Sequence, residues 1–184
     1  MLGRTSRLAA LCVLTAALAA AALGVAGAPA WAAPAAGRAI TASSPLEAAV
    51  LVELNAVRRA HGLTPLRRST PLAAAAAAHS RAMAQHGFFR HESRDGSAFW
   101  QRVQRFYAKG GYARWAVGEN LLWSTRVDAA GAVRLWMQSP PHRKNILAPQ
   151  WREVGLSAVA AEAAPGQFGG RDVVIITSDF GARA

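Results

Sequence analysis

The sequence is poor in cysteine and in acidic residues, and it lacks the local signatures of several large enzyme classes. Its one cysteine is Cys12. No HExxH stretch occurs, because Asp95 stands where the only His-Glu pair, at His91, would need a second histidine. No serine lies in a GxSxG stretch, and neither a Walker loop nor a GxGxxG stretch is present. The usual patterns of zinc peptidases, α/β-hydrolases and nucleotide-binding proteins are therefore excluded.

Residues 1–32 have the pattern of a secretory signal peptide. Arg4 and Arg7 precede an uncharged run over 8–23 that is dense in leucine and alanine. Small alanine side chains follow where a signal peptidase requires them, so we expect cleavage after Ala32. The mature protein is therefore predicted to be secreted, and to be extracellular or associated with the cell wall.

Two other roles for this segment are disfavoured by its own residues. An uncleaved membrane anchor needs about 20 apolar residues in one helix, whereas Gly24, Gly27 and Pro29 interrupt the run. A lipid anchor would use Cys12, but that residue lies inside the apolar run and follows a leucine. We therefore expect no stable membrane span after cleavage.

The predicted mature chain is one strongly basic domain without disulfides. Cleavage leaves 152 of the 184 residues, the size of a single domain, and removes Cys12. It also removes Arg4 and Arg7, which leaves 19 basic and 10 acidic residues and a net charge of +9 with neutral histidines. Such a surface concentrates a secreted protein near an anionic cell-wall polymer or lipid head groups, although simple solubility explains the charge equally well.

Nucleic acid is not an expected partner. The basic pairs Arg58-Arg59, Arg67-Arg68 and Arg143-Lys144 are scattered along the chain and have no aromatic residues between them. A nucleic-acid interface gathers its basic residues on one face or stripe. The expected export of the protein also argues against nucleic acid as a partner.

The order of the predicted elements indicates an α+β fold. Residues 33–44 resemble a flexible leader, and the folded domain is expected over 45–184. Apolar spacing, helix stop signals and β-branched runs predict the following elements. They are helices over 46–60, 71–85 and 99–106, a strand over 117–123, a helix capped by Thr125 with Asp128 that Pro140-Pro141 ends, and strands over 154–160 and 173–178.

Three ionisable residues have unusual surroundings. His91 follows the apolar pair Phe88-Phe89, Glu119 interrupts an apolar strand, and His142 comes directly after two prolines. His79 differs from these, because it shares a helix face with Leu72 and Met83 and is expected to be a hydrogen-bonded core residue. Trp100, Trp115 and Trp123 either flank a ligand groove or pack in the core.

Several segments in a distinctive order carry a resemblance to a known family over about Leu46 to Gly181. These are Leu63-Thr-Pro-Leu66, His79-Ser80 with Met83-Ala84, Phe88-Phe-Arg-His91, Asp95-Gly96, Gly118-Glu-Asn-Leu121, Trp136-Met-Gln-Ser-Pro-Pro-His-Arg-Lys-Asn-Ile-Leu147 and Val154-Gly-Leu156. Together they resemble the bacterial branch of the CAP family, also called the SCP or pathogenesis-related-1-like family.

The resemblance implies an α-β-α sandwich with a short, mostly antiparallel central sheet, and a cleft that gathers two histidines and acidic residues. His91 and His142 match the two histidines, and Glu119 matches the acid of the Gly-Glu-Asn motif. Two positions depart from the pattern. Ser139 stands where many relatives have a second glutamate, and Pro141 replaces the glycine that commonly precedes the second histidine.

The cleft residues allow several kinds of chemistry. His91 and His142, with Glu119 as a further ligand, could bind zinc or another divalent cation and activate a water molecule. Glu119 and Ser139 are then the candidate catalytic residues, but Ser139 leaves the site without the obvious general base.

Other interpretations stay open at this point. The cleft residues could form a purely structural hydrogen-bond network, or Ser139, His142 and Glu119 a serine hydrolase. The chain is thus expected to be a secreted binding module for a small lipid, glycan or peptide ligand, with a metal-dependent extracellular hydrolase, peptidase-like, as the alternative. Ser139 favours binding.

Overall fold

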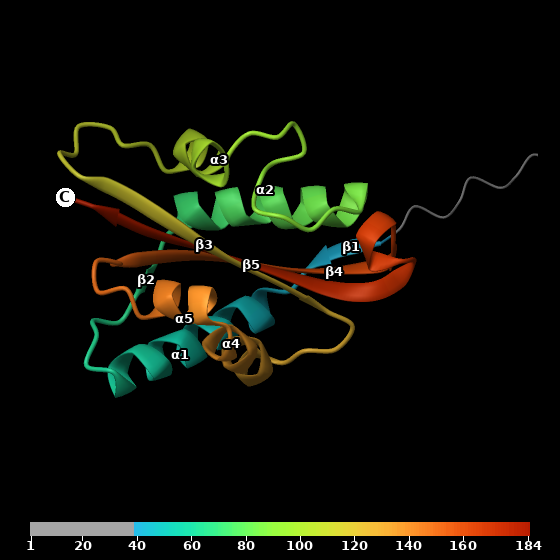
Figure 1. Ribbon diagram of the computed structural model, residues 1–184, viewed down its shortest axis with the longest axis horizontal. Helices are drawn as coiled ribbons and strands as arrows, with labels where there is room; N and C mark the ends of the chain where they lie inside the picture. Colours follow the sequence, from blue (N-terminus) through green and yellow to red (C-terminus); the bar gives the residue numbers. More distant parts are fainter. Residues whose placement is uncertain (1–38) are drawn as a thin grey trace, which may run out of the picture. The chain divides into compact units, whose positions relative to one another are not determined.

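In the computed structural model, which describes residues 39–184, five strands form one sheet between two layers of helices (Figure 1). The strand order is β1-β4-β5-β3, with β2 paired to β4. Every pair is antiparallel except the short β2–β4 contact. The strands are β1 (Ile40–Ala42), β2 (Arg67–Arg68), β3 (Trp115–Ser124), β4 (Glu153–Ala164) and β5 (Arg171–Arg183). The predicted α+β class is confirmed.

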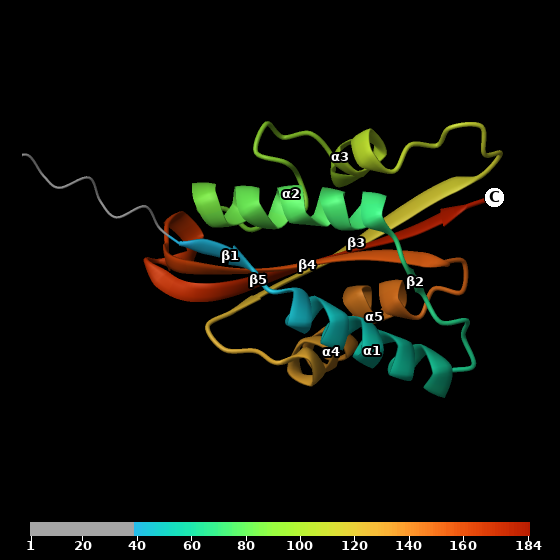
Figure 2. The same cartoon turned by 180° about the vertical axis from the view of Figure 1, so that it is seen from behind.

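The helices divide between the two faces of the sheet, as Figures 1 and 2 show. One face carries α1 (Ser44–Ala60), α4 (Ala129–Gln138) and α5 (Pro140–Ile146), and the other carries α2 (Thr70–His86) and α3 (Phe99–Phe106). A short 3₁₀ helix, η1 (Gly166–Phe168), joins β4 to β5. This layering matches the predicted α-β-α sandwich. No helix within the described range combines the length and the apolar character that a membrane crossing needs.

Each helical layer covers its own apolar cluster. Trp136 and Phe180 belong to the cluster under α1, α4 and α5, while Met83 and Ile175 belong to the one under α2. Neighbouring residues of a strand point to opposite faces. Along β3 this alternation places Glu119 toward α3 and its neighbours toward α5, which determines how the candidate site is built.

The folded part begins before the predicted boundary at residue 45. Strand β1 lies inside the segment 33–44 that was expected to be a flexible leader, and it pairs with Val159 to Ala161 of β4. Ile40 packs against the α2-side cluster, so the strand both pairs the open edge of β4 and covers apolar surface. The signal peptide predicted over 1–32 and residues 33–38 of the predicted leader lie outside the described residues.

One local prediction around α4 is wrong, and a second, that Pro140-Pro141 ends this helix, is confirmed but incomplete. Thr125 was expected to cap this helix, but the helix begins after Asp128, whose carboxylate accepts a 2.7 Å hydrogen bond from the backbone N–H of Gly131. Pro140-Pro141 was expected only to end a helix, yet these residues also start α5. Proline suits the first turn of a helix because its missing N–H would have no partner there.

The cap gives a simple stability prediction. Asp128→Ala should lower the free energy of unfolding by about 1 kcal/mol, because the first turn of α4 loses its side-chain acceptor. Thr125→Ala is the matched control, since Thr125 is exposed and makes no cap. Urea unfolding of both variants measures the difference. Equal midpoints would contradict the assignment of the cap to Asp128.

Candidate functional site

The candidate residues lie on both faces of β3, which is an edge strand of the sheet. Glu119 and Asn120 are neighbours in β3 and point to opposite faces. Glu119 meets His91 above the sheet, while Asn120 reaches the main chain at His142 below it. The strand edge thus brings the two predicted histidines to one region from segments about 50 residues apart in the sequence.

The upper half is a buried ion-pair network around Glu119. The Glu119 side chain is 0% exposed. Its Oε1 lies 2.8 Å from Nδ1 of His91, and its Oε2 accepts a hydrogen bond from the guanidinium of Arg102. Arg102 also donates to the carbonyl of His91, at 3.1 Å. Both carboxylate oxygens are therefore occupied, and the loop that carries His91 is tied to α3.

The network determines the charges of its members. Burial alone would raise the pKa of Glu119, but the hydrogen bond from His91 and the charge of Arg102 outweigh burial and lower it. The hydrogen bond to Glu119 raises the pKa of His91. Glu119 is therefore ionised at neutral pH, and His91 holds a proton more readily than a free imidazole does.

The lower half joins α5 to the edge of β3. Nδ1 of His142 lies 2.9 Å from the hydroxyl oxygen of Ser139. The Asn120 amide donates to the carbonyl of His142 at 3.1 Å, and the Asn145 amide donates to the carbonyl of Glu119 at 3.1 Å. Burial, and then the charge of His91, lower the pKa of His142. The two imidazoles therefore influence each other, and His142 is neutral at pH 7.

The geometry suits a divalent cation held by His91 and His142 alone better than one held by these two residues and Glu119. Both histidines use Nδ1 in the contacts above, to Glu119 and to Ser139, and this leaves Nε2 for a ligand. Metal-binding histidines commonly have such a partner on their other nitrogen. Glu119 does not fit as a third ligand, because both its oxygens are taken and Arg102 adds a positive charge beside it. Within residues 39–184, no group of three or more His, Cys, Asp or Glu side chains could hold a metal ion.

Two buried polar residues of this region, Arg102 and Asp179, were not predicted from the sequence. Arg102 lies on the buried side of α3, where a charge among apolar positions was a usable signal. Asp179 of β5 lies opposite Glu119 and is 0% exposed. His79 is buried as expected, with Nε2 at 2.9 Å from the carbonyl of Arg90, and burial lowers its pKa to about 4.

The tryptophans do not gather around the histidines. Trp115 donates its indole N–H to the carbonyl of Tyr107 at 2.8 Å, and Trp123 packs edge-on against Phe168. Trp100 is 44% exposed on α3. Trp115 and Trp123 thus follow the packing interpretation.

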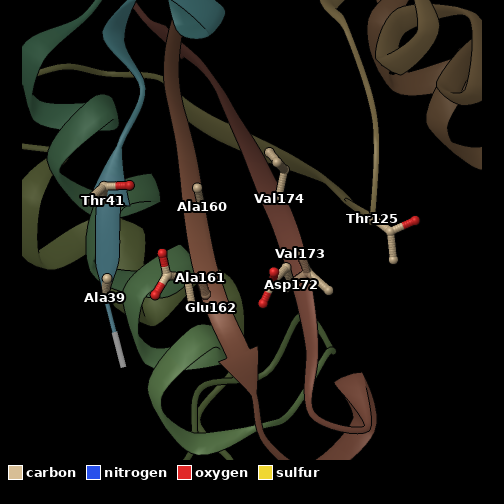
Figure 3. Close-up of a pocket in the computed structure, with 9 residues that line it drawn as sticks. All are labelled: Ala39, Thr41, Thr125, Ala160, Ala161, Glu162, Asp172, Val173 and Val174. Carbon is tan, nitrogen blue, oxygen red and sulfur yellow. The ribbon is translucent and has the colours of Figure 1, made fainter. Parts of the chain in front are cut away.

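A separate pocket lies at the other end of the sheet (Figure 3). It has a volume of about 180 Å³ and is lined by residues of β1, β4 and β5 and by Thr125. Its two acidic residues are Glu162 and Asp172, and Asp172 accepts a 2.9 Å hydrogen bond from the backbone N–H of Ala163. None of the predicted site residues lines this pocket, so it does not bear on the histidine chemistry.

Comparison with known proteins identifies relatives of this chain. The family model described as the cysteine-rich secretory protein family, CAP, matches residues 51–176. The chain is 33% identical over 110 residues to the uncharacterized protein YkwD of Bacillus subtilis (strain 168), covering 59% of this chain and 41% of that protein. It is 30% identical over 110 residues to the uncharacterized membrane protein YlbC of the same strain, covering 60% and 30%. The chain thus spans less than half the length of these curated relatives.

Solved structures show the same fold. An extracellular protein containing an SCP domain from Bacillus anthracis str. Ames superposes with a TM-score of 0.58 at 25% identity, over 75% of this chain and 40% of that one. An outer surface protein from Borrelia burgdorferi gives a TM-score of 0.65 at 15% identity, over 80% and 99%. The second likeness is one of fold alone.

Proposed function

This chain belongs to the cysteine-rich secretory protein (CAP) family, and on that basis we propose that it is a binding module that acts outside a bacterial cell. At the edge of β3, His91 and His142 would hold a divalent cation, and the module would accept a small lipid, glycan or peptide ligand. The observation that carries this proposal is that both imidazoles have their Nδ1 atoms fixed by neighbours while Nε2 is left for a ligand.

An extracellular location is supported by the sequence and by a protein of similar structure. Residues 1–32 have the pattern of a signal peptide, and the similar Bacillus anthracis protein is described as extracellular. The net charge of +9 expected after cleavage attracts the domain to anionic polymers of the cell envelope. Such attraction raises the local concentration of the module near its ligands, and salt screens it.

The proposed cation would be held by His91 and His142. Glu119 orients the first imidazole and Ser139 the second, so each side chain presents Nε2 in a fixed direction. When bound, zinc would supply a Lewis-acid contact for an oxygen or nitrogen atom of the ligand. With two protein ligands, water or the ligand itself would complete the coordination.

Binding is supported over hydrolysis by the state of Glu119. A general base must be within reach of the water from which it takes a proton. The Glu119 side chain is 0% exposed and held by His91 and Arg102, so it does not meet this requirement. Ser139 does contact His142, but the helix that follows begins with Pro140 and Pro141, which have no backbone N–H to stabilise an oxyanion.

Zinc titration of the purified protein tests the proposal. We expect one zinc ion to bind, and His91→Ala or His142→Ala to weaken binding at least about tenfold, because each removes one of two protein ligands. Isothermal titration calorimetry measures the affinity. His61→Ala is the control, because His61 is exposed and its ring bonds only to the carbonyl of Val57. Unchanged affinity in the double variant of His91 and His142 would refute this site.

A further inference from the structure

Asp179 is a fully buried carboxyl group that the proposed binding does not use. It lies on β5 between Glu119 of β3 and Gly155 of β4, and it is 0% exposed. Among the described residues, neither of its side-chain oxygens has a hydrogen-bond partner. A buried polar group without a partner is rare, because it loses its contacts with water and gains nothing in return.

The register of the sheet brings Asp179 close to Glu119. Arg114 and Ala184 exchange both of their backbone hydrogen bonds, at 2.7 and 3.2 Å. In an antiparallel pair such bonded positions alternate with non-bonded ones, so Glu119 and Asp179 form a non-bonded pair. Side chains of such pairs are the closest across a sheet, with Cβ atoms about 4.5–5.5 Å apart. Two carboxyl groups therefore face each other in the interior.

The charges around this pair do not suffice for two carboxylates. Arg102 and, when it is protonated, His91 are the cations that contact Glu119, and both are already hydrogen-bonded to that carboxylate rather than to Asp179. His79 from α2 is neutral, because burial lowers its pKa to about 4. On its other side Asp179 faces Gly155, which has no side chain. An ionised Asp179 would thus add an uncompensated negative charge beside Glu119.

We propose that Asp179 is a neutral carboxylic acid whose O–H donates a hydrogen bond to the Glu119 carboxylate, which makes it a positioning residue for His91. One proton satisfies both groups, since it removes the second negative charge and supplies the missing donor. Glu119 then accepts from Asp179, Arg102 and His91 together. Its Oε1 is thereby held against Nδ1 of His91, which keeps Nε2 directed to the cleft. Burial, followed by the charge of Glu119, raises the pKa of Asp179 well above its usual range, in agreement with this assignment.

The inference rests on the proposed function only in the role given to His91. The protonation of Asp179 itself can be tested without any metal. If zinc fails to bind while Asp179 proves to be protonated, the proposed function fails and the hydrogen-bonded pair stands.

Infrared spectroscopy of the full-length protein at neutral pH provides the test. We expect the carbonyl stretch of a protonated carboxyl group, although exposed carboxyl groups are ionised at that pH. Asp179→Asn should abolish this band. Asp172→Asn, an exposed position on the same strand, should keep it. Absence of the band in the wild-type protein, or its persistence in Asp179→Asn, would overturn the proposal.

A second measurement follows His91 directly. The asparagine amide is neutral and can donate to Glu119 as the acid does, so Asp179→Asn should leave the titration midpoint of His91 in NMR spectra within about 0.3 pH unit of wild type. If Asp179 were ionised, the same substitution would remove a negative charge from the network and lower that midpoint. A clear decrease would therefore count against the neutral acid.

Discussion

Replacing Gly155 with alanine is expected to lower the free energy of unfolding by at least about 3 kcal/mol. A Cβ atom at this position of β4 would lie 2.0 Å from the backbone nitrogen of Ala73 and 2.0 Å from the carbonyl carbon of Leu72. Both atoms belong to the main chain in the first turn of α2, so no side-chain rotation can relieve the contact. The whole start of α2 would have to move away from the sheet.

The matched control is Gly111→Ala. A Cβ atom at Gly111 meets nothing within 4 Å, so the same chemical change there should be within about 0.5 kcal/mol of wild type. Urea unfolding followed by circular dichroism compares the two variants. Similar midpoints would show that α2 does not press on β4 as closely as the structure indicates.

The close approach of α2 also explains how polar side chains come to be buried beneath it. Gly155 lies beside Asp179 in the sheet, and two residues before Asp179 on the same face of β5 the hydroxyl group of Thr177 lies 2.8 Å from that of Ser80. A larger residue at position 155 would lift the helix and admit water to these groups. Gly155→Ala should therefore destabilise the fold and also lower the pKa of Asp179, because hydration favours the charged carboxylate.

Local sequence signals predicted most of the elements that position the site. Gly87 ends α2 in the left-handed conformation expected of a helix stop, with φ of 68°. The strand over 117–123 and both carboxyl-terminal strands are present, and each is longer than predicted because pairing continues past the β-branched core. The helix over 99–106 has the predicted ends.

Tertiary contacts account for what the sequence could not supply. Residues 40–42 become a strand because β4 offers them an unpaired edge, and although Ile40 and Thr41 are β-branched, three residues are too few for a strand pattern. Asp179 follows Thr177 and Ser178 at the end of a β-branched run, and its importance depends on the register that places it opposite Glu119. Register joins residues 60 apart in the chain, so no local pattern encodes it.

The family resemblance located His91, Glu119, Ser139 and His142, but it located neither Arg102 nor Asp179. It suggested Glu119 as a further metal ligand because carboxylates bind divalent cations. The buried guanidinium of Arg102 changes this role, since it occupies one oxygen while His91 occupies the other. A residue type and its place in a motif therefore predicted proximity, whereas the hydrogen-bond partners decide the chemistry.

Replacing Arg102 with methionine is expected to lower the free energy of unfolding at pH 7 by about 3–5 kcal/mol, because it leaves the Glu119 carboxylate buried without its cation. Arg105→Met, on the exposed side of the same helix, should be within about 0.5 kcal/mol of wild type. A double variant with Glu119→Gln should cost less than the sum of the two single variants by at least about 1 kcal/mol, since it removes both charges. Additive losses would contradict a direct ion pair.

The effect of Arg102→Met should also depend on pH, in a direction that Glu119 determines. The folded state lowers the pKa of Glu119 despite its burial, because the His91 hydrogen bond and the Arg102 charge favour the carboxylate. A lowered pKa contributes stability above the unfolded-state value of about 4.3, and this contribution is lost as the pH falls through the folded-state value. The stability difference between wild type and Arg102→Met should therefore be full at pH 7 and shrink as acid protonates Glu119, first in the variant and then in the wild type. A difference that stays constant as the solution is acidified would mean that Arg102 stabilises the fold through the packing of its aliphatic stem. The charge balance from which Asp179 was inferred to be protonated would then be wrong.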